Sequence, residues 1–366
     1  MFWNAKVVRF EGVNVTPQPV DRSTFTPYRV RILVLSSPAS CHGADARTLS
    51  ISQSCVQMRF SLRELAAASA PTLSTELRAR LASQHAALAA AVVPDALQPA
   101  RARLERSWLA ASAAAEDTAA LMEIEEGSQA AVEALRKLPE ATRSGPPSQR
   151  LLRSSFSSLI GNRALVQALA AGAPLMPTAE LSSLLQHVID DSRAFCREKF
   201  GDSPEIRVAE IRVAGGEAST PADSVMLAPF VAFPVHEILK NAMGAHVRRV
   251  GADKLDQLAP IEVRHGVRAG VAFVGVSDYG GGLTEPSHAL RFLQTTNKER
   301  EATYTYSRAF GSAFEGLGVG LPLAALHARY LNGKLFLNAV PNGVHAAFTF
   351  DVTGNSREPE DETPTH

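Results

Sequence analysis

The sequence predicts two folded parts, a helical bundle followed by an α+β domain whose helices cover one face of a mixed, mainly antiparallel sheet. Residues 61–200 are rich in Ala, Leu, Arg and Glu, and their apolar residues recur every three or four positions. Residues 201–352 instead alternate short β-branched and aromatic runs with two helical patterns. With 366 residues, 45% of them hydrophobic, the chain is long enough for two separate cores.

Composition limits the classes of partner. The formal net charge is +0, so no chain-wide basic field favours nucleic acid or an anionic membrane. The longest apolar run, AALAAAVV from Ala86, is too short to span a membrane. The three cysteines, Cys41, Cys55 and Cys196, have neither disulfide-framework nor metal-site spacing. We therefore expect no nucleic acid partner, no membrane span and only local anion sites.

The N-terminal residues 1–60 allow two interpretations. They carry more basic than acidic residues and many Ser and Thr, without the apolar core of a secretory signal, which favours a mitochondrial transit segment. The alternative is an arm at the edge of the domain that contains a short strand such as VRILVLS. Neither pattern decides between the two.

The bundle is predicted from long helical patterns in residues 61–200. The Pro/Gly/Ser-rich stretch at 138–149 predicts a connection between two of its helices. A last helix is expected after Pro177, with Thr178 as its N-cap. Its apolar stripe consists of Leu181, Leu184, Leu185, Val188, Ile189 and Phe195.

The α+β domain is predicted element by element from residue 201. Pro341-Asn342-Gly343 lies between two strand patterns and indicates a hairpin. The polar, acidic residues 353–366 are expected to be disordered. In chain order we expect a strand at 205–215, a helix at 231–247, strands at 261–266 and 271–278, a polar stretch at 284–315, a helix at 321–331, and strands at 334–340 and 344–352.

Three motifs in this domain indicate chemistry. Glu237 and Asn241 are four residues apart in an apolar helix and therefore share one helix face. SDYGGGL places Asp278 at a strand end before a glycine turn, and EGLGVGL opens the next helix. Backbone amides of such a turn at a helix N-terminus can bind phosphate. Each glycine turn alone is common, so the three motifs are informative through their order.

That order resembles the Bergerat-type (GHKL) ATP-binding fold shared by gyrase, MutL, histidine kinases and the mitochondrial kinases of α-ketoacid dehydrogenase complexes. The sequences HEILKNAM, VSDYGGGL and GLGVGLPLAAL are similar to the corresponding motifs of the last group, the pyruvate and branched-chain ketoacid dehydrogenase kinases. LIGNRALVQAL is similar to the closing part of that family's N-terminal four-helix bundle. The resemblance runs from about residue 150 to residue 352.

The resemblance implies ATP and Mg²⁺ as cofactors and assigns roles to individual residues. Glu237 would be the base that accepts the substrate serine's proton, and Asn241 would supply an oxygen ligand to Mg²⁺. Asp278 would accept a hydrogen bond from the adenine amino group. The structural alternatives are a buried hydrogen-bonded network for Glu237 and Asn241 and a turn acceptor for Asp278.

The remaining implied nucleotide contacts fall on the same motifs and on a polar loop. Gly280 and Gly282 would let the backbone approach the base, and 297–315 would form an ATP lid. An ordinary polar loop is the alternative for the threonine pair that precedes this lid. The further implied nucleotide-binding residues are Lys240, Gly244, Thr295, Thr296, Gly316, Leu317, Gly318, Val319, Gly320 and Leu321.

The sequence also departs from the family pattern. Phe233 stands where the pyruvate dehydrogenase kinases have a His four residues before the base. The His next to Glu237 in this sequence, His236, is expected to point to another helix face. Gly244 replaces the family's Arg, and Val344 replaces a Thr in the last hairpin. The bundle's Gln-His pair falls on Ala168 and Leu169, and the only tryptophans are Trp3 and Trp108, so a C-terminal Asp-Trp motif is missing.

We therefore expect a protein serine kinase of the mitochondrial matrix, a homodimer that phosphorylates and inactivates the decarboxylase of an α-ketoacid dehydrogenase complex and binds its lipoyl-bearing core. The first alternative is a nucleotide-binding regulatory protein that has lost phosphoryl transfer. The second is a histidine kinase-like ATPase of the same fold, although His85 and His187 lie in ordinary amphipathic patterns. The sequence leaves the choice between pyruvate and branched-chain complexes open.

Overall fold

The computed structural model describes residues 59–114, 117–171, 175–211, 223–283, 285–294 and 317–358. The N-terminal arm or transit segment predicted at 1–60 therefore lies almost entirely outside the described residues. So do the predicted lid at 297–315, Thr295, Thr296 and Gly316.

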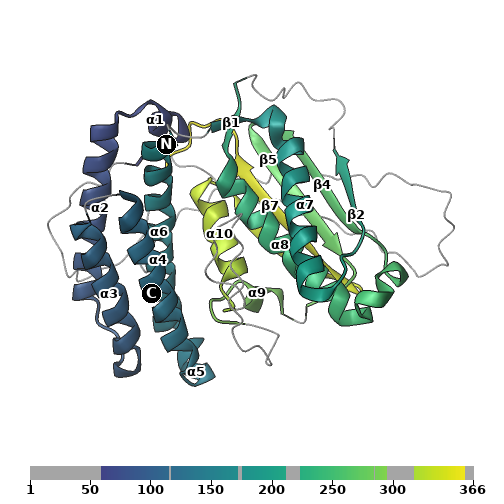
Figure 1. The fold of residues 1–366 in the computed structure, drawn as a ribbon, viewed down its shortest axis with the longest axis horizontal. Helices are drawn as coiled ribbons and strands as arrows, with labels where there is room; N and C mark the ends of the chain where they lie inside the picture. The colour runs from purple at the N-terminus through teal and green to yellow at the C-terminus, as the bar shows by residue number, and fades with distance from the viewer. Residues whose placement is uncertain are drawn as a thin grey trace, which may run out of the picture. The chain divides into compact units, whose positions relative to one another are not determined.

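Four long helices form the bundle (Figure 1): α2 (Ala70–Ala90), α3 (Gln98–Ala113), α4 (Asp117–Arg136) and α6 (Pro146–Ala171). Each of them contacts two others, in the cyclic order α2, α3, α4, α6. The short α1 (Leu62–Ala67) precedes them and begins with a capping box between Ser61 and Glu64. Large apolar side chains such as Trp108 and Phe156 fill the centre of the bundle, which confirms a helical core here.

Two helix starts differ from the sequence-based expectation. The connection predicted at 138–149 is shorter, because α5 (Glu140–Arg143) forms a single turn and α6 already begins at Pro146. Proline is tolerated in a first helical turn, where its missing N–H has no partner to lose. Thr178 does not cap α7 (Leu181–Phe200), since Glu180 occupies the N-cap position after a 3₁₀ turn, and the buried Thr178 hydroxyl has no hydrogen-bond partner among the described residues.

The second part of the chain forms a five-stranded sheet. Its strands, in spatial order, are β2 (Ile206–Glu210), β4 (Ile261–Arg268), β5 (Val271–Asp278), β7 (Gly343–Asp351) and β6 (Lys334–Val340). Only the β2–β4 pair is parallel among these, so the predicted mixed, mainly antiparallel sheet is confirmed. A separate antiparallel pair joins β1 (Leu175–Pro177) to β3 (Val225–Leu227).

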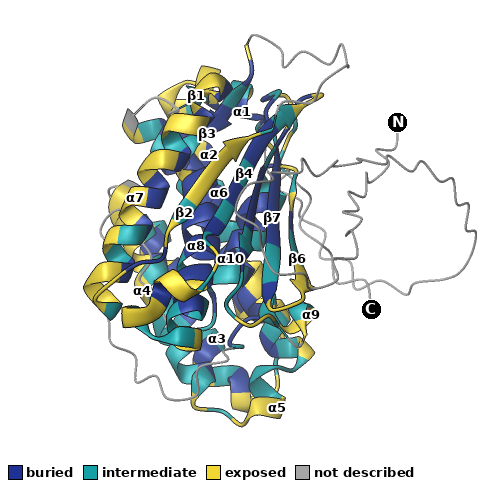
Figure 2. Ribbon diagram, turned by 90° about the vertical axis from the view of Figure 1, so that its right-hand side faces the viewer, coloured by how far each residue is buried: buried dark blue, intermediate teal, exposed yellow. Residues whose placement is uncertain are grey.

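Helices pack on this sheet and join it to the bundle. The helix α8 (Ala228–Val250) contacts β5 and β7, and α7 packs against α8. The helix α10 (Gly320–Tyr330) contacts α8, β6 and β7 as well as α6, so it lies between the bundle and the sheet (Figure 1). In Figure 2 most of β7 is buried, whereas β2 is exposed.

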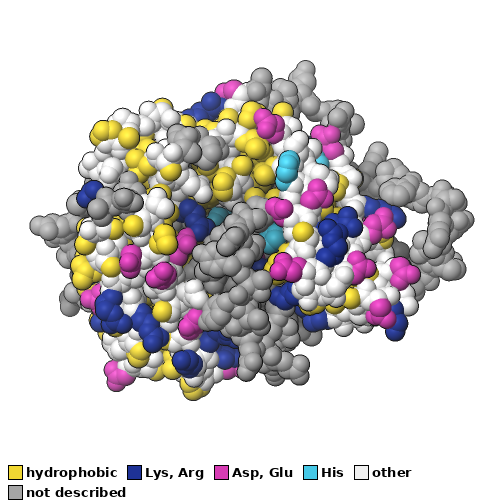
Figure 3. All heavy atoms as spheres, viewed as in Figure 1, with side chains coloured by type: hydrophobic (Ala, Val, Ile, Leu, Met, Phe, Trp, Pro, Cys, Tyr) yellow, Lys and Arg dark blue, Asp and Glu magenta, His cyan; other side chains and the backbone are white. Residues whose placement is uncertain are grey.

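Surface features of the described residues agree with the composition. Acidic and basic side chains are interspersed over the face drawn in Figure 3, without a continuous field of one sign. No helix within the described ranges is both long and apolar enough to cross a membrane.

Part of the acidic C-terminal stretch is ordered, contrary to expectation. Residue Arg357 forms an isolated bridge with Ser61, and the Glu358 amide donates to the Phe60 carbonyl. The Glu358 carboxylate lies 2.8 Å from Arg80 Nη2 of α2 and accepts a 2.7 Å hydrogen bond from the Tyr330 hydroxyl of α10. The polar, acidic composition of residues 353–366 suggested disorder, but the ion pair between the buried Arg80 and Glu358 holds the first part of this stretch in place. Residues 353–358 therefore connect the bundle to the end of α10.

We predict that Glu358→Ala lowers the free energy of unfolding by about 1–2 kcal/mol, because it removes a buried ion pair and the Tyr330 hydrogen bond while Arg80 keeps its other partner, Glu76. Urea denaturation would measure the change. The matched control is Arg357→Ala, which removes an exposed pair with Glu64 and should change stability little. Equal stability of Glu358→Ala and the unmodified protein would contradict a fixed C-terminal segment.

Candidate functional site

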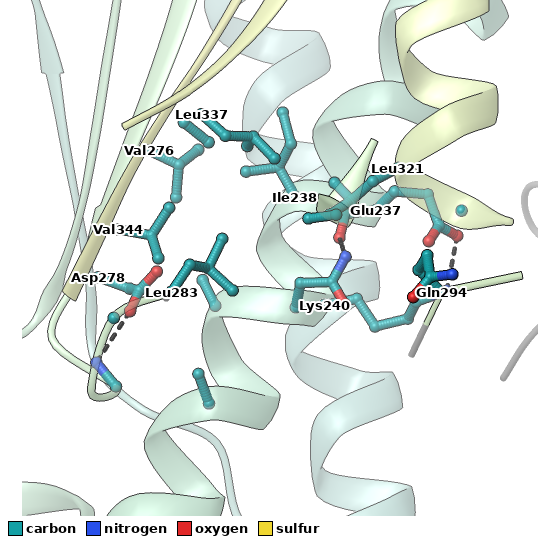
Figure 4. A pocket seen from close by; sticks show the side chains of 18 of the residues that line it. Glu237, Ile238, Lys240, Val276, Asp278, Leu283, Gln294, Leu321, Leu337 and Val344 are labelled. Atoms are coloured by element: carbon teal, nitrogen blue, oxygen red, sulfur yellow. Dashed lines mark hydrogen bonds and ion pairs between the residues drawn. The ribbon is translucent and has the colours of Figure 1, made fainter. Parts of the chain in front are cut away.

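A cavity of about 620 Å³ lies between α8, the ends of β5 and β7, the short helix α9 (Pro286–Ala289) and the start of α10. It lies in the size range of small-molecule sites. Figure 4 shows Asp278 at one end of this cavity and Glu237 with Lys240 at the other. The sequence-predicted residues that line the cavity are Glu237, Lys240, Asn241, Asp278, Gly280, Gly282, Gly318, Gly320 and Leu321.

The helix α8 supplies the polar face of the cavity. Asn241 Nδ2 donates a 2.7 Å hydrogen bond to the Glu237 backbone carbonyl one turn earlier. Only the nitrogen of the amide can donate, so this bond fixes the side chain and leaves Oδ1 as an acceptor or ligand. No described residue hydrogen-bonds to that oxygen. The arrangement fits a hard cation, which prefers oxygen ligands.

Glu237 lies at the point where α8 meets α10. Its side chain is only 4% exposed and forms a 2.6 Å ion pair with Lys240 Nζ. A Cβ at Gly320, the first residue of α10, would come within 2.0 Å of Glu237 Oε2. Because the free N–H groups of a first helical turn favour negative charge, this position suits a carboxylate or a phosphate. Glycine at 320 is therefore required for the carboxylate to stay where it is.

The Asp278 end of the cavity is mostly apolar. The Asp278 side chain is buried, and its Oδ1 accepts a 2.8 Å hydrogen bond from the Gly280 amide. Burial raises the pKa of Asp278, against the backbone hydrogen bonds of Gly280 and Val344 and the nearby Arg248. The apolar side chains around it are Ile238, Val276, Leu283, Leu337 and Val344 (Figure 4). A flat apolar ring with an amino group fits this end.

Close backbone approach explains several glycines. A Cβ at Gly280 would lie 2.4 Å from Ala245 Cβ of α8, and one at Gly343 would lie 1.8 Å from the Asp278 carbonyl oxygen. Gly318 has φ +74°, a conformation that side chains other than glycine rarely adopt. These contacts bring backbone, rather than side chains, to the wall of the cavity.

Some predicted residues do not line the cavity. Leu317 and Val319, on either side of Gly318, are buried in the hydrophobic core. Gly244 lies beneath Arg248, whose Nη1 is 3.1 Å from the position of a Cβ at 244. Thr295, Thr296 and Gly316 lie outside the described residues.

The departures from the family pattern have definite places in the structure. Phe233 stacks on His327 of α10, with ring centroids 4.6 Å apart. His236 lies on another face of α8, as expected, and there its Nδ1 lies 2.8 Å from Ser192 Oγ of α7. The position four residues before Glu237 is thus part of an aromatic contact between α8 and α10.

Sequence reasoning missed Arg248 and Gln294, which also line the cavity. Arg248 could have been found, because it follows Glu237 by 11 residues and therefore lies on the same helix face. Val344, which replaces a family Thr in the last hairpin, lines the cavity as the register partner of Asp278. Gln294 carries no local signal in the sequence.

The turn after Asp278 is attached to α8 by two side chains. The Tyr279 amide donates to His246 Nε2 at 3.0 Å, and Arg249 donates to the carbonyls of Tyr279 and Asn342. Burial and the Arg249 charge lower the pKa of His246 to about 4. His246 Nε2 must be unprotonated to accept this bond, so the neutral imidazole holds the turn in place.

Comparisons with known proteins give one consistent result. No protein-family model matches the chain. The chain is similar to the mitochondrial pyruvate dehydrogenase (acetyl-transferring) kinase of Drosophila melanogaster, with 25% identity over 165 residues, and to human isozyme 4, with 28% over 169 residues. The Ascaris suum kinase of the same name is 28% identical over 174 residues. Each match covers 44% of this chain and only 38–39% of the relative.

We predict that stability falls as the pH drops from about 6.5 towards about 4, in part because of His246. The unfolded histidine binds a proton in this range while the folded one does not, so protons favour unfolding. Urea denaturation at several pH values should show a shallower dependence for His246→Gln, whose carbonyl oxygen can still accept from Tyr279. An identical pH dependence in both proteins would contradict the neutral buried imidazole.

Proposed function

We propose that this chain is an ATP- and Mg²⁺-dependent protein kinase of the α-ketoacid dehydrogenase kinase type, with the Bergerat nucleotide-binding fold. The observation that carries the proposal is one cavity with two chemically different ends, a buried carboxylate among apolar side chains at Asp278 and a carboxylate–carboxamide pair at Glu237 and Asn241. The similarity to named pyruvate dehydrogenase kinases supports the same reading.

The nucleotide would bind with its base at the Asp278 end. The Asp278 carboxylate would accept a hydrogen bond from the adenine amino group, and Val276 and Leu283 would contact the ring. The phosphates would extend along α8 towards the first turn of α10, where backbone amides and Gly318 allow close approach. The cation Arg248 lines the same cavity and lies near Asp278, whose pKa it lowers.

The residues around Asn241 fit a phosphate-bound Mg²⁺. The described residues contain no cluster of three His, Cys, Asp or Glu that could hold a metal ion by themselves. Mg²⁺ commonly takes one or two protein oxygens together with phosphate oxygens and water, which is what Asn241 Oδ1 would provide. The bound ion would neutralise charge on the transferred phosphoryl group.

Glu237 would act as the base. Its carboxylate lies at the phosphate end, and the 2.6 Å contact with Lys240 holds its position. It would accept the proton of a substrate serine hydroxyl as that oxygen attacks the terminal phosphate. The transfer breaks the bond between the terminal phosphorus and the bridging oxygen, so ADP leaves and the serine becomes phosphoserine.

The names of the relatives support pyruvate dehydrogenase as a substrate and the mitochondrion as the location. We propose the matrix as the compartment and a dehydrogenase complex as the target. We propose the decarboxylase component as the phosphorylated protein, the lipoyl-bearing core as a binding partner and a homodimer as the assembly. Incubation with labelled ATP and purified pyruvate or branched-chain dehydrogenase complex would identify the target. Labelling of neither complex by a protein that binds ATP would overturn the kinase proposal.

A nucleotide-binding regulatory protein is the second candidate. It is favoured by Phe233, which stacks on His327 at the position where the resembled kinases carry a histidine beside the base. Such a protein would bind Mg-ATP with the same residues but would not transfer phosphate.

We predict that Asp278→Ala weakens Mg-ATP binding by about tenfold to a hundredfold, because one charge-assisted hydrogen bond to the base is lost. Calorimetry would measure this, and the preference for ATP over GTP should decline in the same variant. The control Asp256→Ala removes an exposed carboxylate outside the cavity and should leave affinity unchanged. Affinity within twofold of the unmodified protein would make Asp278 a turn residue only.

We predict that Glu237→Gln and Asn241→Ala fail in different ways. Glu237→Gln retains the size of the side chain but not a useful base, so Mg-ATP affinity should persist while phosphorylation falls by about 10²-fold or more. Asn241→Ala removes a metal ligand, so binding should weaken with Mg²⁺ and change less without it. Calorimetry with and without Mg²⁺, combined with a phosphorylation assay, separates the two. Full transfer by Glu237→Gln would refute the base assignment.

A further inference from the structure

Residues Phe292–Gln294 lie between the helical bundle and the cavity. Phe292 is buried and stacks on Phe156 of α6, with ring centroids 5.5 Å apart and planes 15° apart. Gln294 lines the cavity, at the end where Glu237 and Lys240 lie (Figure 4). This short segment therefore contacts a bundle helix on one side and the nucleotide cavity on the other.

The contact to the bundle is a two-way hydrogen bond. Gln149, in the first turn of α6, donates from Nε2 to the Phe292 carbonyl at 2.9 Å and accepts from the Phe292 amide at its Oε1 at 2.8 Å. One side-chain amide thus satisfies both backbone groups of one buried residue, as a neighbouring strand would. A second contact from the same region joins the Gln294 side chain to Ser144 Oγ.

The other side of the segment fixes the glycine turn before α10. The Leu293 amide donates to the Gly318 carbonyl at 2.8 Å. A Cβ at Gly318 would come within 2.7 Å of the Gln294 carbonyl oxygen, so the two backbones are in direct contact. The position of Gly318, which lines the cavity next to Gly320, therefore depends on where residues 292–294 lie.

The backbone conformation of the segment requires such support. Leu293 has φ +65°, in the left-handed region that a branched side chain rarely adopts. Conformations of this kind persist only where the surrounding contacts impose them. Here the imposing contacts are the hydrogen bonds of Gln149 to the preceding residue and of Gly318 to Leu293 itself.

We propose that Gln149 is a positioning residue for nucleotide binding: it holds residues 292–294 and, through them, the Gly318 turn of the cavity. The inference rests on the proposed function. It gives the bundle an indirect effect on the shape of the cavity, since Gln149 belongs to α6 and its hydrogen bonds reach the segment that ends at the cavity-lining Gln294. Ser144 supports the same arrangement through Gln294.

The test uses Gln149→Leu, which retains most of the side-chain volume and removes both hydrogen bonds. We expect Mg-ATP affinity, measured by calorimetry, to fall by about 5- to 30-fold. Hydrogen exchange of the peptide containing Phe292 and Leu293 should become faster even without nucleotide, because the Phe292 amide loses its acceptor and the neighbouring Leu293–Gly318 hydrogen bond loses support. Ser144→Ala should shift both quantities in the same direction by a smaller factor, and it carries the test if Gln149→Leu does not fold.

The matched control is Ser158→Ala on the same helix. It removes a 3.0 Å hydrogen bond to Gln84 within the bundle, so it should change neither affinity nor the exchange at Leu293. Affinity within twofold in folded Gln149→Leu, or an equal loss in Ser158→Ala, would overturn the inference. An unmodified protein that binds no nucleotide would instead overturn the proposed function, which makes the two failures distinguishable.

Discussion

The site depends on how closely the α8 face approaches the start of α10. Glu237 is buried there, and glycine at 320 is the only residue type that leaves room for its carboxylate, because a Cβ would come within 2.0 Å of Oε2. Lys240 balances the charge from within α8 itself. The two helices can therefore pack tightly at this point and still enclose polar groups. The cavity is the space that remains beside this contact, bounded by the sheet and by the glycine turns.

The two ends of the cavity follow from what the neighbouring elements contribute. The sheet supplies Val276, Val344 and Leu337, which make the Asp278 end apolar and leave its carboxylate with few polar neighbours. The α8 helix and the α10 start supply donors and acceptors at the opposite end. A ligand with an apolar, amine-bearing ring and an anionic tail matches both ends in one orientation only. This polarity is the physical reason why we propose ATP, rather than a simple anion, as the ligand.

Local patterns predicted much of the fold and the α8 face of the site. The strand at 334–340 was predicted with its observed bounds, because alternation and the Asn342-Gly343 turn are local signals. Helical spacing placed Glu237 and Asn241 on one helix face, while their proposed roles came from the family resemblance. Interactions between distant parts of the chain were not predicted: Gln149 meets Phe292 across 143 positions, and Arg80 neutralises Glu358 in a stretch whose composition suggested disorder. Thr178 failed as a cap because a 3₁₀ turn shifted the N-cap by two residues, from Thr178 to Glu180.

These distant contacts converge on α10 from both directions. At its start, the Gly318 turn is held through residues 292–294 by Gln149 of the bundle. At its end, Tyr330 donates to Glu358, which pairs with Arg80 of α2. Between these points α10 packs on both α6 and α8. Both ends of α10 are thus linked to the bundle by specific contacts. The bundle therefore determines where the first turn of α10 lies, and this turn faces Glu237 in the cavity.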